Sequence, residues 1–232
     1  MSAKESRSRE IALLLPSLGG GGAERAALNL VPGLRHHAYE PLLVLQQATG
    51  ELLDEVPADV PVISLESRRT LQSLLPLTRF LRKRRPAGLV SFLGPTNIVA
   101  IWARALARVD ARLAITQHSA LSLQSREVRH WQQSRLPLFY RAFAREADAI
   151  VAVSNGVADD LAATAHLPRG RIQAIYNPVV TDDFLARLSR PTPEPGPASP
   201  AAPTFVAVAR LAPEKDHATL LSAFALFRER QP

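Results

Sequence analysis

Short apolar runs alternate with longer stretches in which apolar residues recur every three to four positions along most of the chain. The short runs are typical of strands buried on both faces, and the longer stretches predict the helices that cover them. Strands are expected at residues 11–15, 42–45, 60–65, 88–92, 113–116, 149–153 and 172–175. Helices are expected at residues 23–34, 71–84, 97–107, 126–145 and 157–165. This alternation predicts an α/β fold with a doubly wound parallel sheet of Rossmann-like type.

A proline-rich segment interrupts this pattern. Residues 191–203 read PTPEPGPASPAAP, and neither a sheet interior nor a helix tolerates so many prolines. A further strand (204–209) and a further helix (217–230) follow. One strand and one helix cannot bury their own apolar faces, so we expect them to begin a second, incomplete Rossmann-like domain. The predicted organisation is an N-terminal domain over 1–188, a linker over 189–203 and the start of a C-terminal domain over 204–232.

Composition narrows the class of protein. The 232 residues are 47% hydrophobic and 21% charged, which is typical of a globular protein, and the chain has no cysteine for a disulfide framework or a thiolate metal site. The sequence has no apolar run of about 18 residues, the length that spans a bilayer. The apolar stretch near the N-terminus is broken by Pro16 and has no signal-peptide cleavage pattern, so we interpret it as a strand and expect a cytoplasmic protein.

The net charge of +7 favours anionic partners, although an arginine-rich composition can also reflect coding bias. Five cations lie in the segment 79–85, where the end of a helix favours them. The segment 126–145 mixes arginines with aromatic residues, which fits either a helix that docks on an anionic membrane or one packed on the sheet. A non-catalytic basic module that binds nucleic acid or anionic lipid is therefore the alternative function, although no nucleic-acid-binding signature is found.

Four glycines, Gly19–Gly22, join the first predicted strand to the first predicted helix. Glycines allow a ligand to approach the backbone, and the amides that begin a helix bind anions. The dinucleotide fingerprint G-x-G-x-x-G fails, because its third position is Glu24 or Arg25, and Gln46-Gln47 stands where a ribose-binding acid is expected. A nicotinamide-dependent dehydrogenase is disfavoured, while a ligand loop and a plain turn both remain open.

Several polar residues follow other predicted strands. His118 ends one strand, Asn155 follows Ser154 at the end of the next, and Asn177 precedes a proline after the last strand of the domain. Ligands of open α/β sheets collect at the carboxyl ends of strands, so these residues are candidates for a binding cleft. Each also has a structural alternative: a strand-end histidine is often structural, Ser154 or Asn155 can cap a helix, and Asn177 is held extended by its proline.

Arg210 and Lys215 flank the predicted start of the last helix. Two cations at this place suit a diphosphate, and two solvated surface cations are the other interpretation. The sequence has no D-x-D, H-E-x-x-H, G-x-S-x-G or P-loop motif, so no metal site is predicted.

Taken in order, PSLGGGGAERAALNL, the strand-end His118, VSNGVADDL, IYNPV and ARLAPEKDHATLLSAF resemble the family 4 retaining glycosyltransferases of GT-B fold. The resemblance covers nearly the whole chain. It implies two Rossmann-like domains that face each other across a cleft, with the acceptor on the N-terminal side and a nucleotide-sugar, UDP- or GDP-linked, on the C-terminal side. It also implies transfer without a cofactor or a metal to a saccharide or lipid-linked acceptor in cell-surface polysaccharide biosynthesis, and it leaves open peripheral contact with the inner membrane face.

The same resemblance assigns roles to residues. His118 would be the catalytic residue that contacts the donor sugar. Arg210, Lys215, Gly20, Gly21 and Gly22 would bind the donor diphosphate, while Glu24, Arg25, Asn155 and Asn177 would line the acceptor side of the cleft.

One feature of the family is missing from the chain. The family carries two glutamates spaced E-x7-E in its C-terminal domain, and no two glutamates here have this spacing. The resemblance therefore implies a truncated chain that is inactive alone. A GT-B epimerase acting on a nucleotide-sugar is a related alternative, which the GGGGAER segment disfavours.

Overall fold

The computed structural model describes residues 8–126, 135–190, 204–209, 211 and 215–230. The chain divides into two compact units, residues 1–182 and residues 183–232. The first unit contains a seven-stranded sheet with its covering helices, and the second contains one long helix.

Every neighbouring pair of strands in the sheet is parallel. The strand order is β3-β2-β1-β4-β5-β6-β7, so the chain begins in the middle of the sheet, winds to one edge, and then returns to wind to the other. The strands are β1 (Glu10–Leu15), β2 (Glu40–Leu45), β3 (Val62–Ser64), β4 (Gly88–Phe92), β5 (Arg112–Gln117), β6 (Ala149–Ala152) and β7 (Ile172–Ala174). The predicted doubly wound parallel sheet is confirmed.

The apolar runs are continuous because both faces of the sheet are buried. In β1, Ala12 and Leu14 belong to one hydrophobic core, whereas Leu13 and Leu15 belong to another on the opposite face. Side chains of a strand alternate between its faces, so a run without polar positions supplies both cores at once.

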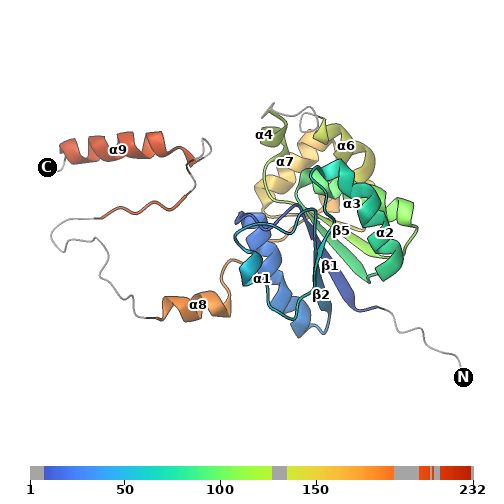
Figure 1. Cartoon of the computed structure of the whole chain (residues 1–232). Coiled ribbons are helices and arrows are strands. Elements are labelled where there is room, and N and C mark those ends of the chain that lie inside the picture. Colours follow the sequence, from blue (N-terminus) through green and yellow to red (C-terminus); the bar gives the residue numbers. More distant parts are fainter. Residues whose placement is uncertain (1–7, 127–134, 191–203, 210, 212–214, 231–232) are drawn as a thin grey trace, which may run out of the picture. The chain divides into compact units, whose positions relative to one another are not determined.

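Helices cover the two faces unequally (Figure 1). Among the described α-helices, only α1 contributes buried residues to the core on one face, whereas α2, α3, α4, α6 and α7 contribute to the core on the other. The helices of the first unit are α1 (Gly22–His36), α2 (Leu74–Arg84), α3 (Gly94–Ala107), α4 (Leu121–Arg126), α6 (Leu136–Phe143) and α7 (Asn155–Ala165), with short 3-10 turns η1 (Leu53–Glu55), η2 (Thr70–Ser73), η3 (Ala144–Glu146) and η4 (Arg169–Arg171). The helix α8 (Asp182–Leu188) lies at the boundary of the two units, and α9 (His217–Arg230) lies in the second.

The single helix predicted at residues 126–145 is wrong. The structure has α4 before this range and α6 within it, and residues 127–134 lie outside the described residues. Pro137 occupies the first turn of α6, where its missing amide hydrogen costs nothing, and so marks a new helix start. The predicted helix at 71–84 is likewise divided, because η2 precedes α2.

Two further differences concern the C-terminal part. Residues 204–209 form no strand, because a strand needs a neighbour to pair with and the described residues of the second unit offer none. The helix expected at 217–230 is confirmed as α9, and α8 was not predicted. The division of the chain into an N-terminal domain, a linker and the start of a second domain stays a prediction.

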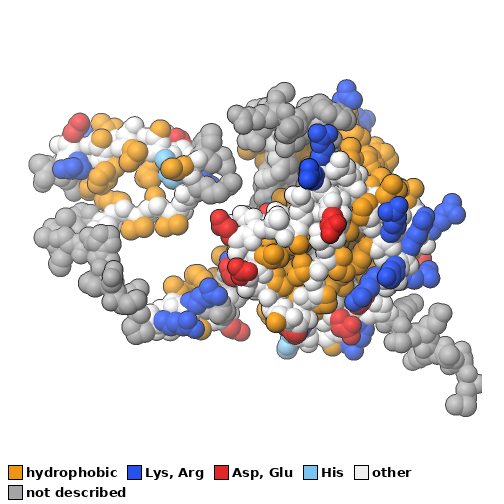
Figure 2. Space-filling view, viewed as in Figure 1, with side chains coloured by type: hydrophobic (Ala, Val, Ile, Leu, Met, Phe, Trp, Pro, Cys, Tyr) orange, Lys and Arg blue, Asp and Glu red, His pale blue; other side chains and the backbone are white. Residues whose placement is uncertain are grey.

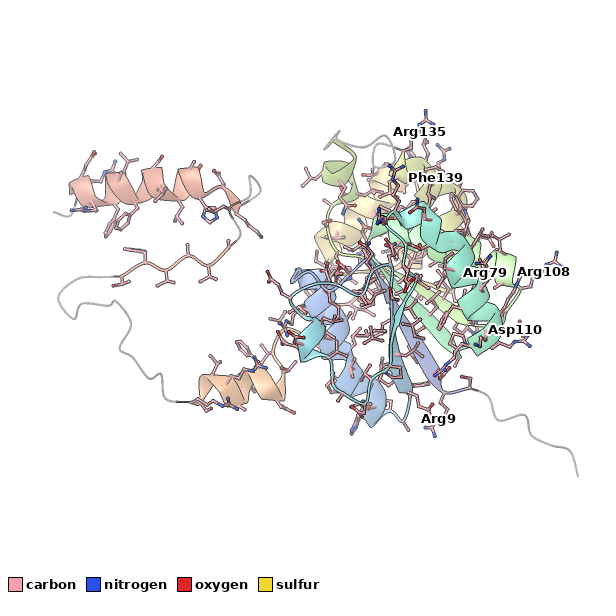
Figure 3. The ribbon with its side chains drawn as sticks, viewed as in Figure 1. Arg9, Arg79, Arg108, Asp110, Arg135 and Phe139 are labelled. Atoms are coloured by element: carbon pink, nitrogen blue, oxygen red, sulfur yellow. The ribbon has the colours of Figure 1, made fainter. Side chains whose placement is uncertain are left out.

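Positive charge gathers on the side of the first unit covered by α2 and α3 (Figure 2). Arg79, Lys83 and Arg85 are exposed there, and Arg108, at the end of α3, extends away from the fold (Figure 3). No helix in the described part of the chain is long and apolar enough to cross a membrane.

Candidate functional site

The carboxyl ends of the strands meet at one edge of the sheet. The turn Gly19–Gly22 follows β1, His118 follows β5, Asn155 follows β6 and Asn177 follows β7, so the parallel topology brings these predicted residues to one edge. The order of strands reverses between β1 and β4, and the connections after these two strands leave toward opposite faces. Such a reversal opens the crevice in which ligands of open α/β sheets bind.

The glycine turn is held by the segment that follows β2. The amide of Leu18 donates to the carbonyl of Thr49 (2.9 Å), and the amide of Leu52 donates to the carbonyl of Leu18 (3.0 Å). Gly50 lies between these bonds with φ +123°, and a Cβ atom there would overlap the carbonyl group of Leu18. The sequence analysis missed Gly50, and its only signal is a lone glycine shortly after a strand.

Helix α1 begins inside this turn. Gly21 is its N-cap and supplies no side chain to the free amides of the first turn, and a Cβ atom at Gly22 would meet open space. Gly20 has φ +84°, which other residues adopt only with strain. Free amides at a helix start bind anions such as phosphate. The diphosphate contact of Gly20, Gly21 and Gly22 stays a prediction.

The two charged residues of the first turn of α1 behave differently. Glu24 lies next to Gly21, so that a Cβ atom on this glycine would overlap the carboxylate. Arg25 instead donates two hydrogen bonds to the carboxylate of Glu55, from Nη1 at 2.6 Å and from Nη2 at 2.7 Å. This ion pair ties α1 to η1, a structural contact that the sequence analysis did not foresee.

His118 is half-buried, and its ring lies 5.5 Å from that of Phe92 between centroids. The Thr116 hydroxyl donates its one hydrogen to the carbonyl of Ser91 (2.9 Å), so it can only accept from His118 Nε2, also at 2.9 Å. The hydrogen-bond network therefore assigns the hydrogen of the neutral ring to Nε2 and the lone pair to Nδ1. That Nδ1 atom is buried and has no hydrogen-bond partner among the described residues.

Burial also fixes the charge of this histidine. Because loss of water disfavours the charged ring, the pKa of His118 falls to about 4, well below its ordinary value near 6.5. The ring is neutral at pH 7. A neutral ring carries a lone pair on Nδ1, which a protonated ring lacks, and a hydroxyl group of a ligand can donate to it once a movement of the ring or of its neighbours exposes this atom.

Asn155 and Asn177 lie at the same edge with different surroundings. Ser154 caps α7 by accepting from the amide of Val157 (3.2 Å), so the capping interpretation is confirmed for the serine. Asn155 Oδ1 accepts from Arg169 Nη2 (3.0 Å), which anchors it to η4. Asn177 is half-buried. The carbonyl of the next residue, Pro178, accepts a hydrogen bond from Asn29 Nδ2 of α1 (2.6 Å).

The two predicted diphosphate-binding cations, Arg210 and Lys215, belong to the second unit. Arg210 lies outside the described residues, and Lys215 is exposed. Their role at a diphosphate stays a prediction. Among the residues that the structure describes, no three His, Cys, Asp or Glu side chains gather as ligands for a metal ion.

The sequence analysis also missed a group of buried polar side chains beneath His118. Asn97 of α3, Gln117 of β5 and Tyr140 of α6 are all almost completely buried and joined by hydrogen bonds. The signal in the sequence is weak: isolated polar residues inside otherwise apolar elements, which sequence alone does not distinguish from exposed positions.

Solved structures similar to this chain share its fold. They include HepE from Anabaena in complex with UDP (TM-score 0.56, 18% identity, 77% of this chain and 48% of that chain) and a glycosyltransferase from Rickettsia africae (0.54, 18%, 79% and 48%). A UDP-N-acetylglucosamine 2-epimerase from Rickettsia bellii is also similar (0.52, 11%, 77% and 48%). At these identities the likeness establishes the fold alone, and it does not separate sugar transfer from epimerisation.

This chain spans about half the length of those structures. No curated protein sequence matches it. The family model for Glycosyltransferase Family 4 matches residues 20–183, a range that includes the last three glycines of the turn, His118, Asn155 and Asn177. The chain belongs to Glycosyltransferase Family 4.

Proposed function

We propose that the first unit is the acceptor-side domain of a retaining, metal-independent glycosyltransferase that moves a sugar from a UDP- or GDP-sugar to a saccharide or lipid-linked acceptor in cell-surface glycan biosynthesis. One observation carries the proposal: uncapped amides at the start of α1 and the free Nδ1 of His118 lie at the same edge of the sheet, within the residues that match the family. HepE, with the same fold, was solved with UDP bound.

The two features suit different parts of a nucleotide-sugar. Free amides at the start of a helix favour the negatively charged diphosphate. The neutral ring of His118 offers an acceptor, which suits a sugar hydroxyl close to the reacting carbon. Arg210 and Lys215 would stabilise the charge that develops on the departing diphosphate, a role that needs no metal ion. Glu24, Arg25, Asn155 and Asn177 would border the acceptor.

The test is a calorimetric titration of the chain with UDP, UDP-glucose, GDP and GDP-mannose. We expect one nucleotide family to bind, and His118→Gln to weaken the nucleotide-sugar while leaving the plain nucleotide unchanged. The double variant Arg210→Ala/Lys215→Ala should weaken both. Absence of binding by all four ligands would contradict the proposal.

We further propose that this chain alone does not catalyse sugar transfer, because it has no two glutamates at the E-x7-E spacing. Release of UDP or GDP from a nucleotide-sugar in the presence of the purified chain would show the opposite. Fusion to a C-terminal domain that carries this glutamate pair should bring transfer activity, and chromatography of the product anomer would test retention.

Contact with an anionic membrane is proposed as a second property, favoured by the face of η2 and α2. Leu71 and Leu75 are 45% and 58% exposed, and Arg79 is exposed one helical turn further. Apolar and basic residues on one face of a helix suit an interface between water and anionic lipid. In sedimentation with vesicles that contain phosphatidylglycerol, a smaller fraction of the protein should pellet when Leu75→Ser/Arg79→Ser is introduced. The alternative function, a non-catalytic basic module, predicts membrane or nucleic-acid binding without any binding of nucleotide-sugars.

A further inference from the structure

The turn that carries His118 rests on a continuous chain of buried hydrogen bonds. Tyr140 of α6 is completely buried, and its hydroxyl accepts from Asn97 Nδ2 (2.7 Å) and donates to Gln117 Oε1 (2.7 Å). Burial raises the pKa of the Tyr140 hydroxyl above its ordinary value, so it is protonated and can donate at pH 7.

Gln117 passes this connection to the residue on the other side of His118. Its Nε2 donates to the carbonyl of Ser119 (2.8 Å) and to Gln124 Oε1 (3.2 Å). Gln124 of α4 in turn donates from Nε2 to the Ser119 hydroxyl (2.6 Å). Both neighbours of the histidine are thereby held by side chains from beneath.

Asn97 completes the set at the end of β5. The same Nδ2 that binds Tyr140 also donates to the carbonyl of Thr116 (2.8 Å), and Thr116 is the residue that accepts from the His118 ring. Two acceptors face this nitrogen, so a reversed amide would place Oδ1 against both of them. The bonds therefore support only one arrangement of residues 116–119.

We propose that Tyr140, Gln117 and Gln124 are positioning residues, which hold residues 116–119 so that the His118 ring donates from Nε2 to Thr116 and keeps its lone pair on Nδ1. An apolar core at these places would bury comparable area without desolvating an amide and a phenol, and would leave the turn free to change its conformation. The link to sugar binding rests on the proposed function, whereas the positioning of the ring does not.

The first test needs no ligand. Long-range ¹H–¹⁵N spectra of the full 232-residue chain report the tautomer of each of its six histidines, and loss of one signal set in His118→Gln assigns His118. In the unmodified chain we expect a neutral ring with the hydrogen on Nε2. Tyr140→Phe should change the tautomer ratio about tenfold, the effect of losing one or two ordinary hydrogen bonds, and move the two ring nitrogen shifts toward each other.

Tyr176→Phe is the matched control, because it removes the same hydroxyl from a tyrosine that is 67% exposed. It should leave the His118 signals unchanged. Gln124→Met, at the half-buried end of the network, provides a second variant if Tyr140→Phe does not fold, and it should give the same direction of change. Folded Tyr140→Phe and Gln124→Met chains that keep the tautomer of the unmodified protein would overturn the proposal.

A second arm connects the positioning to binding. With UDP-glucose and GDP-mannose as probes, Tyr140→Phe should weaken the nucleotide-sugar that binds while leaving UDP or GDP alone unaffected. If the tautomer changes as expected but the unmodified chain binds neither probe, the positioning stands and the proposed glycosyltransferase function fails. If both probes bind equally well to the unmodified chain and to Tyr140→Phe, the ring is not positioned for the ligand and the inference is overturned.

Discussion

At the amino-terminal edge of the sheet, charged side chains are joined to one another, whereas at the carboxyl-terminal edge a polar ring atom is buried without a partner in the described structure. Glu10, the first residue of β1, pairs with Arg84 (2.8 Å), and Asp148, just before β6, binds Arg112 (3.1 Å) and the amide of Leu113 (2.8 Å). At the other edge, His118 Nδ1 is buried and has no partner among the described residues.

The difference separates groups whose hydrogen bonds hold the fold from buried groups that have no partner in the described structure. Ser91 Oγ and Asn97 Oδ1 are also buried without a partner in the described structure. Ser91 lies next to the end of β4, and Asn97 lies in the first turn of α3. Leaving a buried polar atom unpaired costs about 1–3 kcal/mol. All three atoms lie near the carboxyl-terminal edge of the sheet, the edge at which ligands of open α/β sheets usually bind.

The largest expected effect comes from the carboxyl-terminal edge. Gly50→Ala should destabilise the protein by about 3 kcal/mol, because it strains a backbone with φ +123° and pushes against the Leu18 carbonyl. Chemical denaturation monitored by circular dichroism measures this. Gly170→Ala is the control, since no atom lies near its added Cβ. Equal stability of the two variants would refute the close contact between Gly50 and the Leu18 carbonyl.

The second prediction concerns pH and the same edge. The folded-state pKa of His118, about 4, lies below the ordinary value of 6.5, so between these values the unfolded chain binds a proton that the folded chain does not. Stability should therefore fall as the pH is lowered from 6.5 toward 4, by up to about 1.4 kcal/mol per pH unit from this group. Urea titrations at several pH values measure the slope.

His118→Gln should remove that contribution, so the difference in stability between the variant and the unmodified chain should itself depend on pH across this window. A constant difference from pH 7 to pH 5 would show that the ring is not buried in its neutral form.

At the amino-terminal edge, Asp148→Asn should cost about 1–2 kcal/mol, since it leaves Arg104 and Arg112 without their shared carboxylate. Burial raises the pKa of Asp148, but the Leu113 amide and the two arginines outweigh it, and the pKa is lowered overall. Its stabilisation is therefore present above the ordinary aspartate range and lost as the pH falls through the lower folded value, a more acidic window than that of His118. Asp110→Asn, an exposed neighbour, should have little effect by the same urea titration.

The smallest effect tests whether glycine is needed away from the carboxyl-terminal edge. Gly33 lies inside α1, and no atom lies near an added Cβ. Gly33→Ala should stabilise the protein by about 0.5–1 kcal/mol, because alanine favours a helix and restricts the unfolded chain. A lower thermal midpoint for this variant would contradict that view of the glycines.

The spacing of hydrophobic residues predicted secondary structure correctly where an element has the same surroundings along its whole length. The runs at β1, β4 and β5 predicted strands within one or two residues, because burial on both faces favours apolar side chains there. It failed at residues 126–145, where apolar spacing continues across a helix start at Pro137, and at 204–209, where strand propensity has no neighbouring strand.

The candidate site divides in the same way. Glycines after β1 and a histidine after β5 could be placed at one edge from the sequence, because parallel strands end together. The ion pair between Arg25 and Glu55 could not be predicted from the sequence, since two residues thirty positions apart leave no local signal of their contact. The amide of Gln117 and the phenol of Tyr140 meet only when β5 and α6 pack.

The sequence by itself determined the order of strands and helices, the parallel sheet and the family to which the chain belongs, because these depend on local patterns of hydrophobicity and on short motifs. Only the tertiary structure decided which polar groups are satisfied and which remain open. Hydrogen-bond partners and burial are set by contacts between distant segments, and these contacts assign the hydrogen of His118 to Nε2 and leave the buried Nδ1 without a partner among the described residues.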